Sequence, residues 1–202
     1  HLRMEGRYGL FASADPIEKH THVIFRFTDD TELRYRDVRQ FGTMHLFNPG
    51  EEWENNPLKK LGLEPLDRSF TFEAFQTAIA KRSSQIKRVL LNQEVIAGLG
   101  NIYVDEALFR ARIHPELTVS DLTEEKLKHL YDAILATLQE AVDHGGTSVK
   151  SYVNGQGEMG MFQQQLKVYG RKNQPCDSCG SMIERTVVGG RGTHICPVCQ
   201  QK

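Results

Sequence analysis

The four cysteines of this chain have the spacing that most clearly indicates chemistry. They form two Cys-x-x-Cys pairs, Cys176/Cys179 and Cys196/Cys199, late in the 202 residues. Each pair can place two thiolates on one side of a tight turn, and two pairs complete a tetrahedral Zn²⁺ site with no open position for a substrate. The spacing therefore predicts one structural zinc ion. Disulfides are the weaker alternative, because nothing in the sequence reads as a signal peptide and the chain is expected to be cytoplasmic.

A glycine-rich turn between the two cysteine pairs carries an arginine. Ile183 to Val188 alternates and is rich in β-branched residues, which predicts a strand, and the run Gly189-Gly190-Arg191-Gly192 predicts the turn that follows. A guanidinium at such a tip suits bidentate contact with a phosphate, whereas a solvated loop arginine is the alternative. Residues 167–202 carry six basic and two acidic side chains, a net charge of about +4. This local charge is typical of a phosphate-binding surface.

The composition is that of a globular protein with one or two domains. Hydrophobic residues make up 39% of the chain and charged residues 25%, and no apolar run is long enough to span a membrane. The net charge of -1 combines a basic tail with an acidic remainder, so local patches would bind a nucleic acid. Because His1 opens the chain within predicted β structure, we expect the chain to be part of a longer protein.

The first 47 residues are predicted to form an antiparallel sheet. Residues 22–27 and 32–39 alternate apolar and polar side chains across a short turn, as a hairpin with one buried face does. We expect Arg34 and Arg36 to lie on the solvated face of this hairpin. Arg39 and Phe41 stand at the mouth of the next loop, where a cation beside an aromatic ring forms a candidate wedge for stacked bases.

The sequence changes to a helical period after a proline-rich linker at 48–67. Helices are predicted from Phe72 to about Arg82 and again after Ser83 or Ser84, with Lys87 directed away from the apolar side. A turn at Gly98-Leu99-Gly100 precedes a third helix capped by Asn101. The free N–H groups at this helix start are a candidate anion site, and a helix corner without a ligand is the alternative. Thr123 is expected to cap a fourth helix that ends at Gly145-Gly146.

These stretches together resemble one family, the bacterial formamidopyrimidine-DNA glycosylases, which are 8-oxoguanine DNA glycosylase/AP lyases. The resemblance spans the whole chain and favours this branch over the endonuclease-eight-like branch because of the Arg39-x-Phe41 pair. Its matching stretches are His1 to Gly6, Leu33 to Gly42, Gly98 to Glu106, and the cysteine finger with Gly190 to His194.

The resemblance implies an α+β fold with three parts. Residues 1–60 would be the remainder of an N-terminal antiparallel β-sandwich, and 61–165 a helix-two-turn-helix domain. A lesion-capping loop would lie at 147–162 within that domain, and 166–202 would form the zinc finger. The implied partner is double-stranded DNA with an oxidised base or an abasic site, bound by a monomer without any membrane.

The resemblance also implies roles for individual residues. An extruded base leaves a gap in the stack, and the residues implied to fill it are Met4, Arg39 and Phe41, with Arg39 facing the orphaned cytosine. Arg191 would also assist the late elimination step of strand cleavage. The implied DNA contacts are His1, His20, Arg39, Asn101, Tyr169 and Arg191. The implied capping-loop residues are Val149, Lys150, Ser151 and Tyr152.

One departure from the family concerns catalysis. The nucleophile of the family is an N-terminal proline amine followed by a glutamate, with a lysine farther along for elimination, and these 202 residues contain none of the three at those positions. Without the amine no Schiff base forms, so the chain alone is predicted to be inactive. Two alternatives stay open: a non-catalytic zinc-stabilised DNA-binding module, and an endonuclease-eight-like glycosylase for oxidised pyrimidines.

Overall fold

The computed structural model describes residues 1–148 and 159–202. The chain divides into two compact units, one made of residues 1–48 and 143–164 and the other of residues 49–142 and 165–202. The sequence-based division into parts at 1–60, 61–165 and 166–202 stays a prediction. No helix within the described residues is long and apolar enough to cross a membrane.

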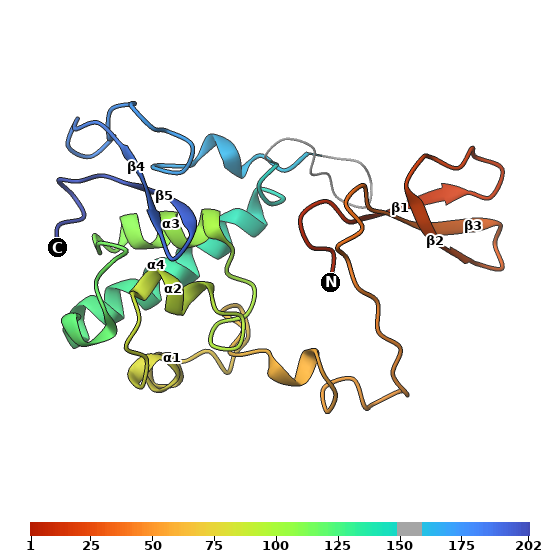
Figure 1. Ribbon diagram of the computed structural model, residues 1–202, viewed down its shortest axis with the longest axis horizontal. Coiled ribbons are helices and arrows are strands. Elements are labelled where there is room, and N and C mark those ends of the chain that lie inside the picture. The colour runs from red at the N-terminus through yellow and green to blue at the C-terminus, as the bar shows by residue number, and fades with distance from the viewer. Residues whose placement is uncertain (149–158) are drawn as a thin grey trace. The chain divides into compact units, whose positions relative to one another are not determined.

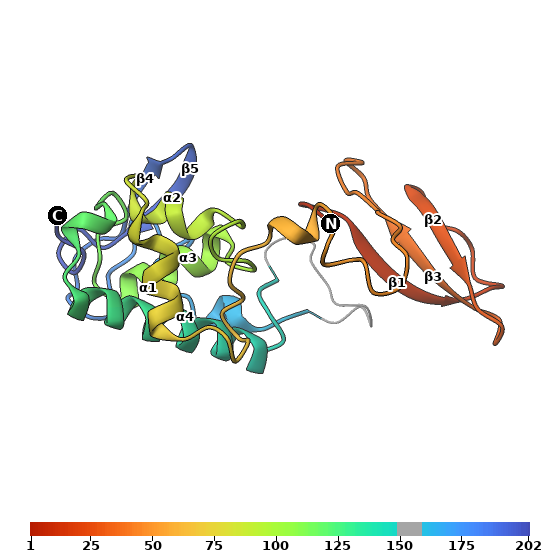
Figure 2. The same cartoon turned by 90° about the horizontal axis from the view of Figure 1, so that it is seen from below.

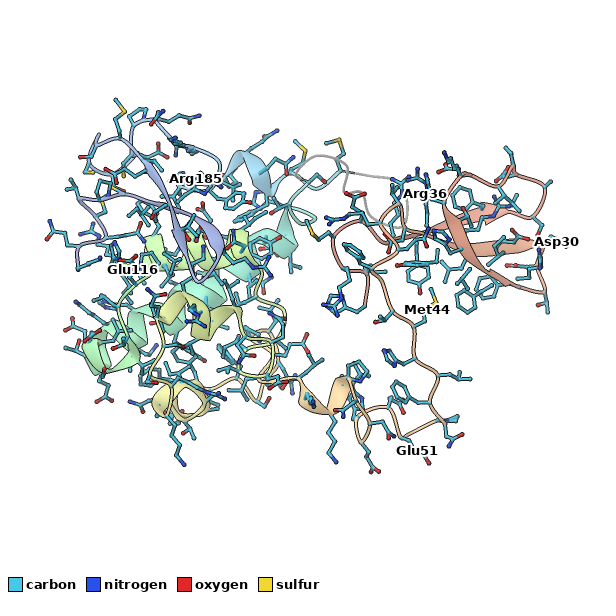
Figure 3. All side chains as sticks on the ribbon, in the orientation of Figure 1. Asp30, Arg36, Met44, Glu51, Glu116 and Arg185 are labelled. Carbon is cyan, nitrogen blue, oxygen red and sulfur yellow. The ribbon has the colours of Figure 1, made fainter. Side chains whose placement is uncertain are left out.

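The first unit contains a three-stranded antiparallel sheet, drawn in Figures 1 and 2. Its strands are β1 (Arg7–Ala12), β2 (Thr21–Arg26) and β3 (Thr31–Arg36), and β3 lies in the centre. The register places Arg36 opposite both Arg7 and Thr21. Figure 3 shows Asp30, in the turn before β3, and Arg36 at opposite ends of that strand. The predicted antiparallel pairing of the second and third runs is confirmed.

Arg34, in the central strand, is buried, and its predicted solvated position is wrong. Its side chain is 2% exposed and its Nε donates to Glu32 Oε2 at 2.8 Å. The guanidinium also donates to the backbone carbonyls of Ala12, Asp15 and Pro16, in and just after β1. The connection from β1 to β2 therefore covers this face of β3, which the alternating pattern of β3 alone does not indicate. Arg36, by contrast, remains partly exposed, with 30% of its side chain accessible.

The second unit is a helical domain that carries a β-hairpin (Figure 1). Its elements include α1 (Phe72–Ala80), α2 (Ile86–Leu91), α3 (Asn101–Arg110) and α4 (Glu124–Asp143), whose last residue joins the first unit. Short 3-10 turns lie at Leu58–Lys60 and Val119–Asp121, and a further one at Phe162–Gln164 belongs to the first unit. Apolar side chains spaced three and four residues apart meet in one core. Its fully buried members include Phe75, Ile79, Ile86, Leu90, Leu108, Leu130 and Ile134.

The predicted helix caps agree with the structure in one case and differ in two. Thr123 Oγ1 accepts the Lys126 N–H at 3.3 Å at the start of α4, as predicted. Asn101 is not a cap: α3 is capped by Gly100, and Asn101 is its first residue. Neither Ser83 nor Ser84 caps α2, which begins after Gln85 without a side-chain cap. In that case the Ile86 N–H is taken by the Leu117 carbonyl instead.

The hairpin pairs β4 (Glu184–Val188) with β5 (Arg191–Ile195). Arg191 faces Val188 in the register, so it opens β5, and the two-residue turn is Gly189-Gly190. Both glycines have positive φ, at 58° and 76°. A Cβ on Gly189 would lie 2.5 Å from Cγ of the Arg88 side chain on α2, so a larger residue would displace that side chain as well as strain the turn.

Candidate nucleic-acid interface

The four cysteines come together as the sequence predicts. Their Sγ atoms all lie within 4.8 Å of one another, and none forms a disulfide. Cys176 and Cys199 are 3.9 Å apart and Cys179 and Cys196 are 3.4 Å apart. A Zn–S bond of about 2.3 Å in a tetrahedron gives S···S distances of about 3.8 Å, close to both. The donor set therefore fits one Zn²⁺ bound by four thiolates, which leaves no position for a substrate.

Glu106 of α3 fixes the segment that leads into the finger. Its buried carboxylate accepts three backbone N–H groups, those of Lys167 at 2.8 Å, Val168 at 3.0 Å and Tyr169 at 2.8 Å. Burial raises the pKa of this carboxyl, and the three N–H donors oppose that shift. The chain before the first cysteine is thus bound to a helix by one side chain, which orients the backbone of Tyr169.

Lys87 of α2 joins the helices to the hairpin, although it was predicted to point away from the apolar side. Its side chain is fully buried, and its Nζ lies 2.5 Å from Asp105 Oδ1. The same Nζ donates to Thr193 Oγ1 at 2.8 Å and to the Gly192 carbonyl at 3.2 Å. Asp105 completes the link by accepting the His194 N–H at 2.9 Å. Burial lowers the pKa of Lys87, while Asp105 acts in the opposite direction.

Three predicted DNA contacts, Asn101, Tyr169 and Arg191, lie on these same elements and are termed here the phosphate cluster. Asn101 Nδ2 donates to the Gly192 carbonyl at 2.9 Å, directly beside Arg191. The Tyr169 ring packs edge-on against the His194 ring with centroids 4.9 Å apart. Arg191 is exposed at the start of β5. Helix α3, the finger entry and β5 therefore bring an amide, a phenol and a guanidinium to neighbouring positions.

The predicted intercalating residues Met4, Arg39 and Phe41 also meet, and are termed here the wedge. Arg39 Nη1 lies 3.2 Å from Met4 Sδ, and Arg39 Cζ lies 4.6 Å from the centroid of the Phe41 ring. Met4 is 74% exposed and Phe41 54% exposed, so both side chains that contact Arg39 are open to water. A thioether, a guanidinium and a phenyl ring are thus held side by side in contact with water.

The remaining predicted contacts in the first unit, His1 and His20, are hydrogen-bonded to residues two positions from Phe41 and Arg39 respectively. The His1 carbonyl accepts the Thr43 N–H at 3.0 Å, which pairs the segment before Met4 with the segment after Phe41. His20 has a positive φ of 68° and its carbonyl accepts the Asp37 N–H at 3.1 Å. The predicted capping-loop residues Val149, Lys150, Ser151 and Tyr152 lie outside the described residues.

Sequence reasoning missed the side chains that support these two groups. Lys87, Asp105 and Glu106 were assigned only to helix surfaces or early turns, and the buried acceptor Asp37 was not singled out. Charge within the run Ile86-Lys87-Arg88-Val89-Leu90 does not single out Lys87, because Arg88 beside it is also charged and is exposed. The partners could not be found this way, because Thr193 is 106 residues from Lys87.

Comparison with known proteins gives the class of this chain first. Three family models match it: the formamidopyrimidine-DNA glycosylase N-terminal domain at residues 1–44, the H2TH domain of the same enzymes at 61–153, and the zinc finger found in FPG and IleRS at 173–202. The combination of a helix-two-turn-helix domain with a four-cysteine finger places the chain in a class of DNA glycosylases.

Individual relatives then give the family. The chain is 65% identical over 201 residues to formamidopyrimidine-DNA glycosylase from Brevibacillus brevis, covering 100% of this chain and 73% of the relative. A complex of a Lactococcus lactis FPG mutant with Fapy-dG-containing DNA has a TM-score of 0.92 at 44% identity, covering 100% of this chain and 74% of the other. A complex of MutM with carbocyclic 8-oxo-G DNA has a TM-score of 0.91 at 43% identity, covering 100% and 73%. The chain belongs to the formamidopyrimidine-DNA glycosylase family.

Proposed function

We propose that this chain carries the DNA-binding and lesion-recognition part of a base-excision repair enzyme for oxidised purines in double-stranded DNA. Family membership and the oxidised purines in the DNA of its structural relatives support the substrate class. The observation that carries the proposal is the wedge. Met4 and Arg39 are 35 residues apart, yet they lie in contact and remain exposed. An insertion role accounts for two large apolar groups held beside a guanidinium in water.

The roles of the wedge residues follow from their chemistry. Once the damaged nucleotide leaves the stack, Met4 occupies the gap and Phe41 separates the neighbouring base step, offsetting an unstacking free energy of a few kcal/mol. Arg39 then faces the unpaired base of the other strand, and its guanidinium can donate to the acceptors of cytosine. The base opposite the lesion is therefore read at Arg39.

The phosphate cluster supplies the sequence-independent part of binding. Arg191 offers a bidentate contact to a phosphate oxygen pair, while Asn101 and Tyr169 supply single donors. His1 and His20 add contacts on the other unit. In the intact enzyme Arg191 also assists the late elimination step. The zinc ion takes no part in chemistry in this proposal, because its four thiolates fill the coordination shell.

For the 202-residue polypeptide itself, we predict binding without excision. No residue in it stands at the position of the proline amine that forms the Schiff base in the family. In this form the polypeptide acts as a zinc-stabilised DNA-binding module, and its cytoplasmic location and monomeric state also stay predictions. The formamidopyrimidine-DNA glycosylase relatives favour oxidised purines over the endonuclease-eight-like alternative.

The experiment compares duplexes that differ only at one base pair. Equilibrium binding is measured for 8-oxoguanine opposite cytosine, 8-oxoguanine opposite adenine, and the undamaged duplex, and borohydride trapping is run on the same samples. We expect tighter binding to the lesion opposite cytosine and no trapped complex. Equal affinity for all three duplexes would refute the recognition role, and a trapped covalent complex would refute the predicted inactivity.

A further inference from the structure

Asp37 is a buried carboxylate directly after β3 and close to the wedge. It is 1% exposed, and its Oδ2 accepts the Tyr35 hydroxyl at 3.0 Å and the Gly42 N–H at 2.9 Å. Its Oδ1 accepts the Arg39 N–H at 3.1 Å. One side chain therefore holds the backbone on both sides of Phe41.

The Tyr35 hydroxyl, which donates to Asp37, also packs against the segment that carries Met4. A Cβ on Gly42 would lie 1.7 Å from Tyr35 Oη, and a Cβ on Gly6 would lie 2.6 Å from the same atom. Such distances are far below van der Waals contact, so both loops approach this hydroxyl only because they have glycine there. The two wedge-bearing segments thus meet at one phenol.

The backbone beside the wedge is held in a conformation that L-residues rarely adopt. Gln40, between Arg39 and Phe41, has a φ of 56°, and Arg3, next to Met4, has a φ of 55°. A non-glycine residue stays in this region only where its surroundings hold it there. The bonds from Arg39 and Gly42 to Asp37 bracket Gln40 and supply that restraint.

The backbone of Asp37 also reaches a predicted DNA contact. Its N–H donates to the His20 carbonyl at 3.1 Å, and its carbonyl lies 2.9 Å from His22 Nε2. The side chain of Asp37 therefore faces the wedge, while its main chain faces the segment of His20. These two sets of contacts can be separated by a substitution that changes only the side chain.

We propose that Asp37, together with Tyr35, is a positioning residue that presents Arg39 and Phe41 beside Met4 as a preformed wedge. The inference rests on the proposed function. In it, recognition of the opposite base depends on Asp37, although Asp37 itself does not touch DNA. A wedge that is ordered before binding avoids the entropy cost of ordering its loop on DNA. Loss of the Asp37 carboxylate should therefore reduce opposite-base recognition and leave the phosphate contacts unchanged.

The test uses Asp37→Asn in the 202-residue chain, with Asp29→Asn as the matched control. An amide offers one acceptor oxygen and turns an N–H₂ group toward a backbone N–H, so the bracket around Gln40 is lost. Asp29 is also a hydrogen-bonded aspartate of the same unit, accepting the Thr31 N–H at 3.1 Å and the Thr31 hydroxyl at 2.6 Å, but it lies in the β2–β3 turn.

The readouts are the affinity ratio for 8-oxoguanine opposite cytosine over adenine and the salt dependence of binding. We expect Asp37→Asn to reduce the affinity ratio about tenfold, toward the ratio of Arg39→Ala. The slope of log affinity against log salt should stay unchanged, because the main-chain contact to His20 is kept. Asp29→Asn should change neither. The double variant Asp37→Asn/Arg39→Ala should lose no more than Arg39→Ala alone, since Asp37 acts through Arg39.

A replacement variant and the unaltered chain complete the test. If Asp37→Asn does not fold, Tyr35→Phe replaces it, since this variant keeps two of the three bonds to Asp37 and should reduce the ratio about threefold. A folded Asp37→Asn chain with the unaltered ratio, or additive losses in the double variant, would refute the inference alone. Failure of the unaltered chain to prefer the lesion opposite cytosine would refute the proposed function and this inference with it.

Discussion

The wedge and the phosphate cluster are built in opposite ways. Met4, Arg39 and Phe41 come from two loops and are exposed, and the carboxylate of Asp37 accepts the backbone N–H groups of Arg39 and Gly42. Asn101, Tyr169 and Arg191 stand on or beside α3 and β5, which the buried Lys87–Asp105 pair joins through hydrogen bonds to β5. The supporting carboxyls differ accordingly. The Gly42 N–H lowers the pKa of Asp37, whereas burial raises the pKa of Glu106.

The difference matches the roles proposed for the two groups. Residues proposed to enter a base stack must keep their apolar atoms exposed before binding, so only the backbone beneath them can be fixed. A phosphate contact depends on the placement of a donor to within tenths of an ångström, and rigid elements joined through a buried core provide that placement. The predictions that follow probe this division, beginning with the phosphate cluster.

Removal of zinc should have the largest effect and should act on the finger. Binding of the metal supplies most of the folding free energy of such a four-cysteine site, so the hairpin that carries Arg191 should lose its structure. We expect DNA affinity to fall at least a hundredfold after chelation, measured by fluorescence anisotropy with metal loss verified. Re-addition of Zn²⁺ should restore binding. Unchanged affinity in the verified metal-free chain would contradict a role for the finger in binding.

The finger shows how far sequence alone can go. Cys176, Cys179, Cys196 and Cys199 were identified together with their metal because thiolate spacing and coordination geometry are both local. The helix cap at Thr123 was found for the same reason. Arg191 was recognised as a candidate, but its place at the start of β5, not in the turn, depends on which residues pair across the hairpin.

Substitution of Lys87 by methionine should have the next largest effect. The variant leaves the Asp105 carboxylate buried beside an apolar side chain, and breaking a buried pair in this way costs about 3–5 kcal/mol. We expect that loss in the free energy of unfolding from chemical denaturation. Lys128→Met is the control, because its pair with Asp132 is about half exposed and is worth at most about 1 kcal/mol. Equal losses in both variants would show that Lys87 is not a structural link.

Arg34 and Lys87 mark the limit of sequence-based prediction in this chain. Arg34 was expected on a solvated face and Lys87 away from the apolar side of its helix, and both residue types are rarely fully buried. Both are buried because acceptors from distant segments surround them, the carbonyls of Ala12, Asp15 and Pro16 for one and Asp105 with Thr193 for the other. A periodic pattern describes one element at a time and carries no information on such partners.

Single alanine substitutions in each group should separate affinity from discrimination. Arg191→Ala removes a phosphate contact, so it should weaken binding to every duplex alike and reduce the slope of log affinity against log salt by about one. Arg39→Ala should instead reduce the preference for cytosine opposite the lesion by about 1–3 kcal/mol with less change in the slope. Binding titrations at several salt concentrations on the same duplexes measure both. A changed opposite-base preference in Arg191→Ala would break the division.

The smallest expected effect is a pH dependence that originates beneath the wedge. Burial, and then the hydrogen bond to Asp37, raises the pKa of Tyr35 from 10.0 to about 12 in the folded chain. Between these values the folded state retains a proton that the unfolded state loses, so this contribution to stability is complete below pH 10.0 and is lost as the pH rises to about 12. Denaturant unfolding across that window should show a steeper decline for the unaltered chain than for Tyr35→Phe. The tyrosinate absorbance of the folded chain should likewise contain one late-titrating group that Tyr35→Phe lacks. Identical pH profiles for the two chains would show that the phenol does not hold its proton for Asp37.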